Sequence, residues 1–184
     1  MWSSEADGLF ARAYIAVQAG QVEEAEELYR EAAESGHVTA AYNLAELLTR
    51  LPGREEDAED ACRAAAEAGD PDGWWLLADL LEEIEGREEE AEAAWRTALA
   101  AGSSEADTGL GRFLIGHGRE AEAASVLAPA VARGDADALY WLGLVRENQD
   151  RLDDAALLYE QAAAEGNTDA LSGLERVRAE QERL

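Results

Sequence analysis

The sequence predicts an all-α protein of five helix-turn-helix repeats followed by a C-terminal capping helix. The first observation is that the segment YREAAESGHVTAAYNLA, which begins at Tyr29, returns in related form at Cys62, Leu127 and Tyr159. The second is that glycines recur in two interleaved series with a spacing of 32 or 33 residues. The third is that the segments between these glycines repeat small and large apolar residues at helical spacing. Two turns in each period indicate two helices in each repeat.

The two glycine series mark the ends of the helices. The series that ends each repeat is Gly36, Gly69, Gly102, Gly134 and Gly166. The series inside the repeats is Gly20, Gly53, Gly86 and Gly118, with Asp150 in the equivalent place. Glycine tolerates the left-handed turn that follows a helix, and the acids after the second series suit the positive end of the next helix. Each turn of the second series therefore carries a signal for the end of one helix, the glycine, and a signal for the start of the next, the acids.

The repeats follow one another without a linker. They are predicted over 6–36, 37–69, 70–102, 103–134 and 135–166. A capping helix, 167–184, turns strongly polar after Leu174, as an outer face in water requires. Stacked repeats bury a continuous core that no single pair could bury alone. We therefore expect residues 1–184 to behave as one domain.

The packing faces of the helices recur from repeat to repeat. In the first repeat Ala25, Tyr29 and Ala32 place a small, a large and a small residue on one face of the second helix. The same pattern starts at Ala58, Ala91, Ala123 and Ala155. The first helices carry a leucine followed by a small residue, at Leu44-Ala45, Leu77-Ala78, Leu110-Gly111 and Leu142-Gly143. Small residues on these faces predict a close approach of neighbouring helices.

These residues resemble the tetratricopeptide repeat, whose signature is followed most fully by Trp74, Leu77, Ala78, Leu81, Ala91, Trp95 and Ala98. The junctions are similar to the Sel1-like branch, in which an aromatic residue, two alanines and a glycine precede an Ala-rich helix start. The resemblance runs from about Ala6 to Leu174 and implies a right-handed α-α superhelix, or solenoid. The chain departs from the pattern at Arg12, at Asp107, and in lacking a proline at the end of the second helix.

Composition limits the partners and the compartment. The formal net charge is −26, from 41 acidic and 15 basic residues, and every basic residue is arginine. Such a charge repels phosphate backbones and anionic lipids, so neither a nucleic acid nor a membrane is expected as partner. A single cysteine fits a reducing compartment, and the start MWSSEADGLF lacks a secretory signal. We expect a cytoplasmic bacterial protein from a GC-rich genome.

The sequence offers little for catalysis. His37 and His117 lie in turn regions with no cysteine at a metal-binding spacing, and Cys62 occupies a core position of its helix. Acidic runs such as the one at Glu88 are explained as solvated residues at helix starts. We therefore predict no enzyme activity, no metal and no cofactor.

The resemblance implies that the first helix of each pair lines a concave groove. The positions outside the leucine face, transferred to this chain, are Phe10, Tyr14, Tyr42, Asn43, Glu46, Arg50, Trp75, Asp79, Glu82, Thr108, Arg112, Tyr140, Trp141, Glu147 and Arg176. Trp74 matches a packing position, whereas its neighbour Trp75 points about 100° away around the helix. Aromatics beside acids favour a protein or peptide with basic and apolar residues.

Three functions are compatible with these patterns. The first is a non-catalytic scaffold or adaptor that binds a peptide or partner protein in the groove. The alternative is an acidic inhibitor, immunity-type protein or mimic that neutralises a basic partner through its surface charge. Self-association through the terminal repeats or Trp2 is a third possibility.

Overall fold

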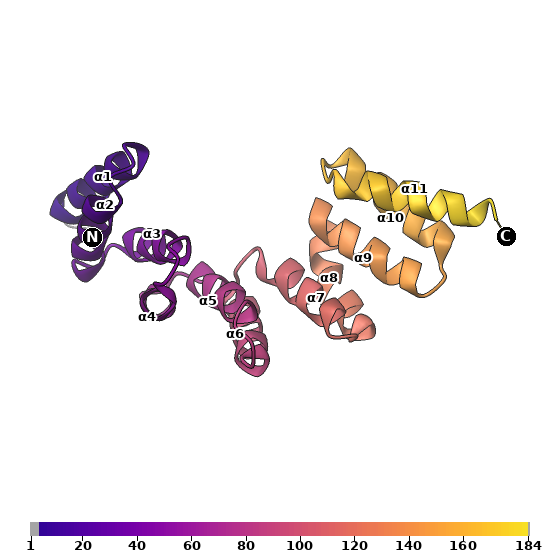
Figure 1. Cartoon of the computed structure of the whole chain (residues 1–184), viewed down its shortest axis with the longest axis horizontal. Helices are drawn as coiled ribbons and strands as arrows, with labels where there is room; N and C mark the ends of the chain where they lie inside the picture. Colours follow the sequence, from indigo (N-terminus) through magenta and orange to yellow (C-terminus); the bar gives the residue numbers. More distant parts are fainter. Residues whose placement is uncertain (1–3, 184) are drawn as a thin grey trace. The chain divides into compact units, whose positions relative to one another are not determined.

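The computed structural model describes residues 4–183, which form eleven α-helices and no strand (Figure 1). Trp2 and Leu184 lie outside the described residues. The prediction of five helix pairs followed by a single helix is confirmed. The helices are α1 (Ser4–Gln18), α2 (Val22–Glu34), α3 (Val38–Thr49), α4 (Glu55–Glu67), α5 (Asp72–Glu82), α6 (Glu88–Ala101), α7 (Ala106–Gly116), α8 (Glu120–Arg133), α9 (Ala136–Asn148), α10 (Leu152–Ala164) and α11 (Asp169–Gln181).

The helices group into two compact units. One unit ends at Ser104 and contains α1 to α6, and the other begins at Glu105 and contains α7 to α11. Within each unit, successive helices pack against each other, so that each helix contacts the one before and the one after it. That the whole length behaves as one domain stays a prediction.

The turns have the backbone conformation that the glycine series predicts. All nine glycines of the two series have positive φ angles, between 71° and 105°. Asp150, which stands in the place of the missing glycine, also has a positive φ of 57°. Asparagine and aspartate tolerate this left-handed region better than other residues with a side chain. The repeat therefore keeps its turn geometry where the sequence departs from glycine.

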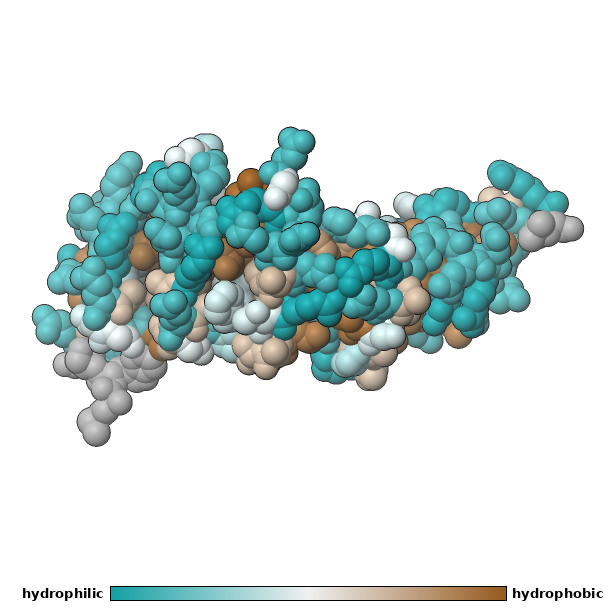
Figure 2. All heavy atoms as spheres, turned by 90° about the horizontal axis from the view of Figure 1, so that it is seen from below, coloured by the Kyte–Doolittle hydropathy of each residue, from teal (hydrophilic) through white to brown (hydrophobic). Residues whose placement is uncertain are grey.

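The small-large-small faces form the core. The alanines of these faces are fully buried, and the large residue between them is 0–2% exposed in every repeat. The first helix of each pair carries small residues where the large residue of the second helix lies close to its backbone. At Gly111 an added Cβ would lie 2.4 Å from the Leu127 side chain, and at Gly143 it would lie 2.7 Å from the Tyr159 ring. Hydrophilic side chains cover much of the face seen in Figure 2, with apolar residues gathered between them.

Two arginines, at the starts of α4 and α6, tie successive repeats together. Arg54, before α4, donates from Nη1 and Nη2 to Glu26 of α2 at 3.2 and 2.9 Å. Arg87, before α6, reaches Glu59 of α4 in the same way at 3.3 and 3.0 Å. Each arginine also donates to an acid three residues further along the sequence, Arg54 to Asp57 and Arg87 to Glu90. At these two turns the arginine is thus an inter-repeat clamp.

The clamp predicts a loss of stability in acid. Hydrogen bonds from Arg87 hold the pKa of Glu59 below its usual range, although burial of the carboxylate opposes this. A lowered folded-state pKa stabilises the fold above the unfolded pKa of about 4.3, and this contribution is lost as the pH falls through the folded pKa. We expect Glu59→Gln to lower the free energy of unfolding at pH 7 by about 1–2 kcal/mol and to flatten its decline in acid.

Urea denaturation from pH 7 to pH 3 checks this expectation, with Glu89→Gln as the control. Glu89 is an exposed residue of the first turn of α6. Its replacement removes the same charge without touching the clamp, so its curve should follow that of the wild type. Parallel pH curves for Glu59→Gln and the wild type would show that the clamp contributes nothing.

Candidate functional site

A groove runs along α1, α3 and α5, which are the first helices of the three repeats in the first unit. It consists of two neighbouring hollows of about 180 and 320 Å³. Glu46 and Arg50 line both hollows, so the two hollows adjoin at this ion pair. The smaller is lined by Tyr14, Val17, Gln18, Tyr29, Asn43, Glu46, Leu47 and Arg50, and the larger by Glu46, Thr49, Arg50, Trp75, Leu76, Asp79, Leu80 and Glu83.

Contacts of His37 and Phe10 at the start of α3 fix the position of this helix, which carries residues of the groove. His37 caps the helix, and its Nδ1 accepts a hydrogen bond from the backbone N–H of Ala40 at 3.1 Å. The Phe10 ring stacks on the His37 ring with 4.5 Å between centroids, and it lies 6.0 Å from the Tyr29 ring. Phe10 is half-buried in these contacts. It supports the junction of the first two repeats.

Polar side chains on α3 form the middle of the groove. The Asn43 amide donates to the Tyr29 hydroxyl at 3.3 Å, and Arg50 donates to the Glu46 carboxylate at 2.7 Å. Burial raises the pKa of Tyr29 above its usual value, so its hydroxyl is a neutral hydrogen-bonding group. Tyr14, 53% exposed, stands at the α1 side. The middle of the groove therefore offers hydroxyl, amide and ion-pair groups to a ligand.

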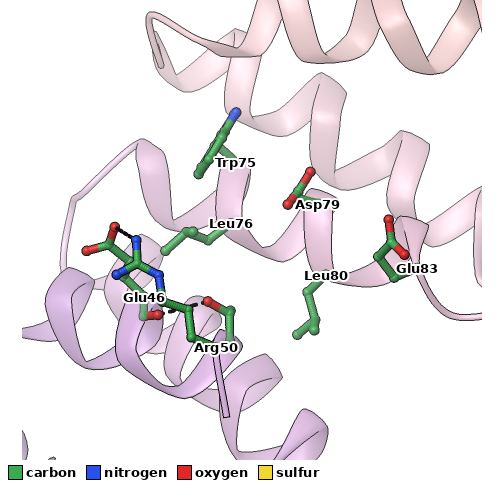
Figure 3. A pocket seen from close by; sticks show the side chains of 8 residues that line it. Glu46, Arg50, Trp75, Leu76, Asp79, Leu80 and Glu83 are labelled. Carbon is green, nitrogen blue, oxygen red and sulfur yellow. Dashed lines mark hydrogen bonds and ion pairs between the residues drawn. The ribbon is translucent and has the colours of Figure 1, made fainter. Parts of the chain in front are cut away.

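The α5 side combines an indole, an apolar floor and carboxylates. Figure 3 shows Trp75 and Asp79 side by side on α5, with the Glu46–Arg50 pair opposite on α3. Leu76 is 6% exposed, and Leu80 lies one turn beyond it. Glu83 is the C-cap residue that directly follows the last residue of α5. Trp75 is half-buried, whereas Asp79 and Glu83 are exposed.

The structure brings six of the predicted site residues together in this groove: Tyr14, Asn43, Glu46, Arg50, Trp75 and Asp79. Tyr42 and Glu82 are half-buried residues on the same helices and do not line either hollow. Thr49, Leu76, Leu80 and Glu83 line the groove but were not predicted. The i, i+4 and i+8 spacing of Trp75, Asp79 and Glu83 is the signal that could have identified Glu83.

The remaining predicted residues belong to the second unit, where several support packing. Tyr140 contacts Trp141 and Tyr159, with ring centroids 5.1 and 5.8 Å apart. Tyr140 and Trp141 are half-buried against the core clusters of this unit. Glu147 accepts hydrogen bonds from Tyr159 and Arg176 at 2.7 Å each. Binding by these residues stays a prediction, as it does for the half-buried Thr108 and Arg112.

Cys62 and His117, which were considered for catalysis or metal binding, both pack against other residues of the fold. Cys62 is fully buried, and burial raises the pKa of its thiol to about 12, so the reactive thiolate does not form at neutral pH. His117 stacks on Phe113 with 4.1 Å between ring centroids. Within residues 4–183, no three histidine, cysteine or acidic side chains gather to hold a metal ion. None of the described helices has both the length and the apolar character needed to span a membrane.

A family model for the tetratricopeptide repeat matches residues 10–73 and 108–170. The chain belongs to the tetratricopeptide repeat family. This tetratricopeptide repeat protein is similar to YrrB, described as a TPR protein with an unusual peptide-binding site, at 22% identity and a TM-score of 0.64, over 91% of this chain and 90% of that chain. It is also similar to a Sel1 repeat protein from Oxalobacter formigenes, at 22% identity and a TM-score of 0.70, over 97% and 87% of the two chains.

An immunity protein from Pseudomonas aeruginosa is a third similar structure, at 25% identity and a TM-score of 0.59. The similarity covers 92% of this tetratricopeptide repeat protein and 68% of the immunity protein. No curated protein matches the sequence. The family match and the similar solved structures confirm the predicted tetratricopeptide and Sel1-like repeat fold. The fold is typical of scaffolds for protein–protein interaction.

Proposed function

We propose that the chain is a non-catalytic scaffold that binds a peptide segment or a partner protein in the groove of α1, α3 and α5. The observation that supports this most strongly is that two hollows adjoin at Glu46 and Arg50 along the first helices of three successive repeats. The groove presents Tyr14 and Trp75 near its two ends, with hydrogen-bonding groups between them. Aromatic side chains provide large contact areas with few rotatable bonds, and polar groups at intervals can hold an extended backbone.

Replacing Trp75 tests this function, and its neighbour Trp74 provides a matched control. Both are half-buried tryptophans of α5, but only Trp75 lines the larger hollow. Peptides are first selected by the wild-type protein from a random display library. We expect Trp75→Ala to weaken their binding about tenfold or more and Trp74→Ala to leave it nearly unchanged, as measured by titration calorimetry. Circular dichroism confirms that both variants fold. Equal affinities of Trp75→Ala and the wild type would refute the groove assignment.

A second candidate is an immunity-type protein that neutralises a basic target through its surface. The similarity to an immunity protein and the net charge of −26 favour it. Its binding would decline steeply with added salt, because exposed charges are screened, whereas binding in a desolvated aromatic groove would decline little. Calorimetric titrations repeated at salt concentrations from about 50 mM to about 500 mM separate the two candidates, because the distance over which exposed charges interact shortens strongly over this range.

A further inference from the structure

We propose that one molecule of this chain binds a second molecule end to end, with α1 of one copy lying antiparallel against α11 of the other. The contact lies outside the groove and does not depend on the function proposed above. No helix within residues 4–183 precedes α1 or follows α11, so each of these two helices has one face without a neighbouring helix. The two faces carry opposite charges and exposed apolar side chains in matching order.

The repeat shows which face of α1 lacks a neighbour. In later repeats the first helix packs on the second helix of the repeat before it, and Gly73 of α5 and Gly173 of α11 lie against that helix. When the repeats are aligned on their buried positions, Gly8 and Ala11 take the places of these two glycines. Ile15 lies one turn further along the same face. All three residues of α1 are exposed, and Ile15 is 66% exposed.

A cation lies in the middle of this face of α1. Arg12 stands where the other first helices carry a leucine, and those leucines are buried or half-buried: Leu44, Leu77, Leu110, Leu142 and Leu174. Arg12 is exposed, and it has neither a hydrogen bond nor an ion pair among the residues that the structure describes. The face therefore offers an apolar side chain beside a guanidinium that can accept a partner of opposite charge.

The uncovered face of α11 has an anion in the equivalent place. In the other first helices this face packs on the second helix of the same repeat, as Gly143 of α9 does on Tyr159. Glu175 takes the place of Gly143; it is exposed and also lacks a polar partner in the described part of the chain. Leu171, one turn before it, is 53% exposed. Its counterparts are buried or half-buried: Ala41, Trp74, Asp107 and Leu139.

The two faces match when the helices run antiparallel, as successive helices joined by short turns do in a solenoid. Ile15 then meets Leu171, and Arg12 meets Glu175 one turn away on both helices. The contact covers two exposed apolar side chains and pairs two charges that have no partner within one molecule. A face that met only water would be expected to carry polar residues in place of Ile15 and Leu171. A second copy of the chain supplies both the apolar group and the opposite charge.

The contact joins two different faces, so it does not close on itself. A pair of molecules retains one uncovered α1 face and one uncovered α11 face, and further copies can add to either. The net charge of −26 opposes this association through repulsion between molecules, which salt screens. A contact between two helices is also small. We therefore expect a weak association that requires moderate salt and high protein concentration.

Sedimentation velocity of the full chain and of two variants tests the contact. Ile15→Glu introduces a carboxylate on the α1 face, and Leu171→Glu introduces one on the α11 face. In about 150 mM salt the average mass of the wild type should double between about 10 µM and about 500 µM, and each variant alone should stay monomeric. An equimolar mixture of the two variants should form dimers and nothing larger, because each variant supplies the intact face that the other lacks.

Leu157→Glu is the matched control for both variants. Leu157 of α10 is 55% exposed, and its position is exposed in the second helix of every repeat. This variant should associate as the wild type does. The charge reversals Arg12→Glu and Glu175→Arg should each prevent association, whereas the two reversals combined in one chain should restore it. Circular dichroism should be the same for all variants, since every replaced residue is exposed.

Three results would overturn the end-to-end contact. The first is a wild type that stays monomeric at the highest concentration. The second is a mixture of Ile15→Glu and Leu171→Glu that forms no dimer. The third is association of either of these variants by itself, because this would place the contact on two identical faces or on a different surface.

Discussion

Replacing Gly73 by alanine should destabilise the first unit by about 3 kcal/mol. Gly73 is a buried residue in the first turn of α5, where this helix crosses α4. A Cβ at this position would lie 2.4 Å from the backbone nitrogen of Ala66 and 2.9 Å from the carbonyl oxygen of Cys62. Backbone atoms cannot rotate aside as a flexible side chain does, so α5 would have to move away from α4. That movement would loosen the packing around both helices.

The same substitution at Gly8 is the control, because its environment is the opposite. Gly8 is an exposed residue within α1, and an added Cβ would meet nothing within 4 Å. Alanine has the higher helix propensity, so Gly8→Ala should stabilise the chain by about 0.5–1 kcal/mol. Urea denaturation gives the two changes, and hydrogen exchange locates the loss in α4 and α5. Similar effects of the two substitutions would contradict the packing argument.

The repeat architecture could be predicted because it depends on local rules. Gly102 and Gly134 end their helices in the left-handed conformation that the glycine series predicts. The alternation of Ala91, Trp95 and Ala98 indicated one face of a helix, and that face is buried. These features require only the spacing of residues along one or two turns of the chain. The sequence shows such spacing directly.

Contacts between repeats were harder to predict, because the sequence does not show which residues meet. Gly73 and Gly8 are both helical glycines, yet only the structure shows that Gly73 lies against the backbone of α4. The bonds of Arg54 and Arg87 to an acid 28 residues earlier were not predicted either, since they depend on how the helices stack.

The candidate site was predicted in part for the same reason. The choice of Trp75 over Trp74 for the groove agrees with the lining of the hollow, because the helical angle between neighbouring residues separates them. For Tyr140 and Trp141 this angle was insufficient, since both rings pack partly on the core. How far an aromatic ring is covered depends on helices that lie outside its own sequence window.

Replacing Tyr159 by alanine should destabilise the second unit by about 4 kcal/mol. Its ring is fully buried on α10, and an added Cβ on Gly143 of α9 or on Gly173 of α11 would lie 2.7 or 2.8 Å from it. Its hydroxyl donates to Glu147 at 2.7 Å, and Glu147 also accepts from Arg176 of α11. The ring thus fills the space between three helices, and its loss leaves a large cavity. Urea denaturation of the full chain measures the change.

Two further variants separate the ring from its hydroxyl. Tyr159→Phe keeps the ring and leaves Glu147 bonded to Arg176, so it should cost only about 1–2 kcal/mol. Gly143→Ala should destabilise the wild type and Tyr159→Phe alike, because the new methyl group meets the ring in both. In the Tyr159→Ala background the same change should cost little, since the methyl group enters the cavity. An equal cost of Gly143→Ala in all three backgrounds would show that the tyrosine ring does not set the approach of α9 to α10.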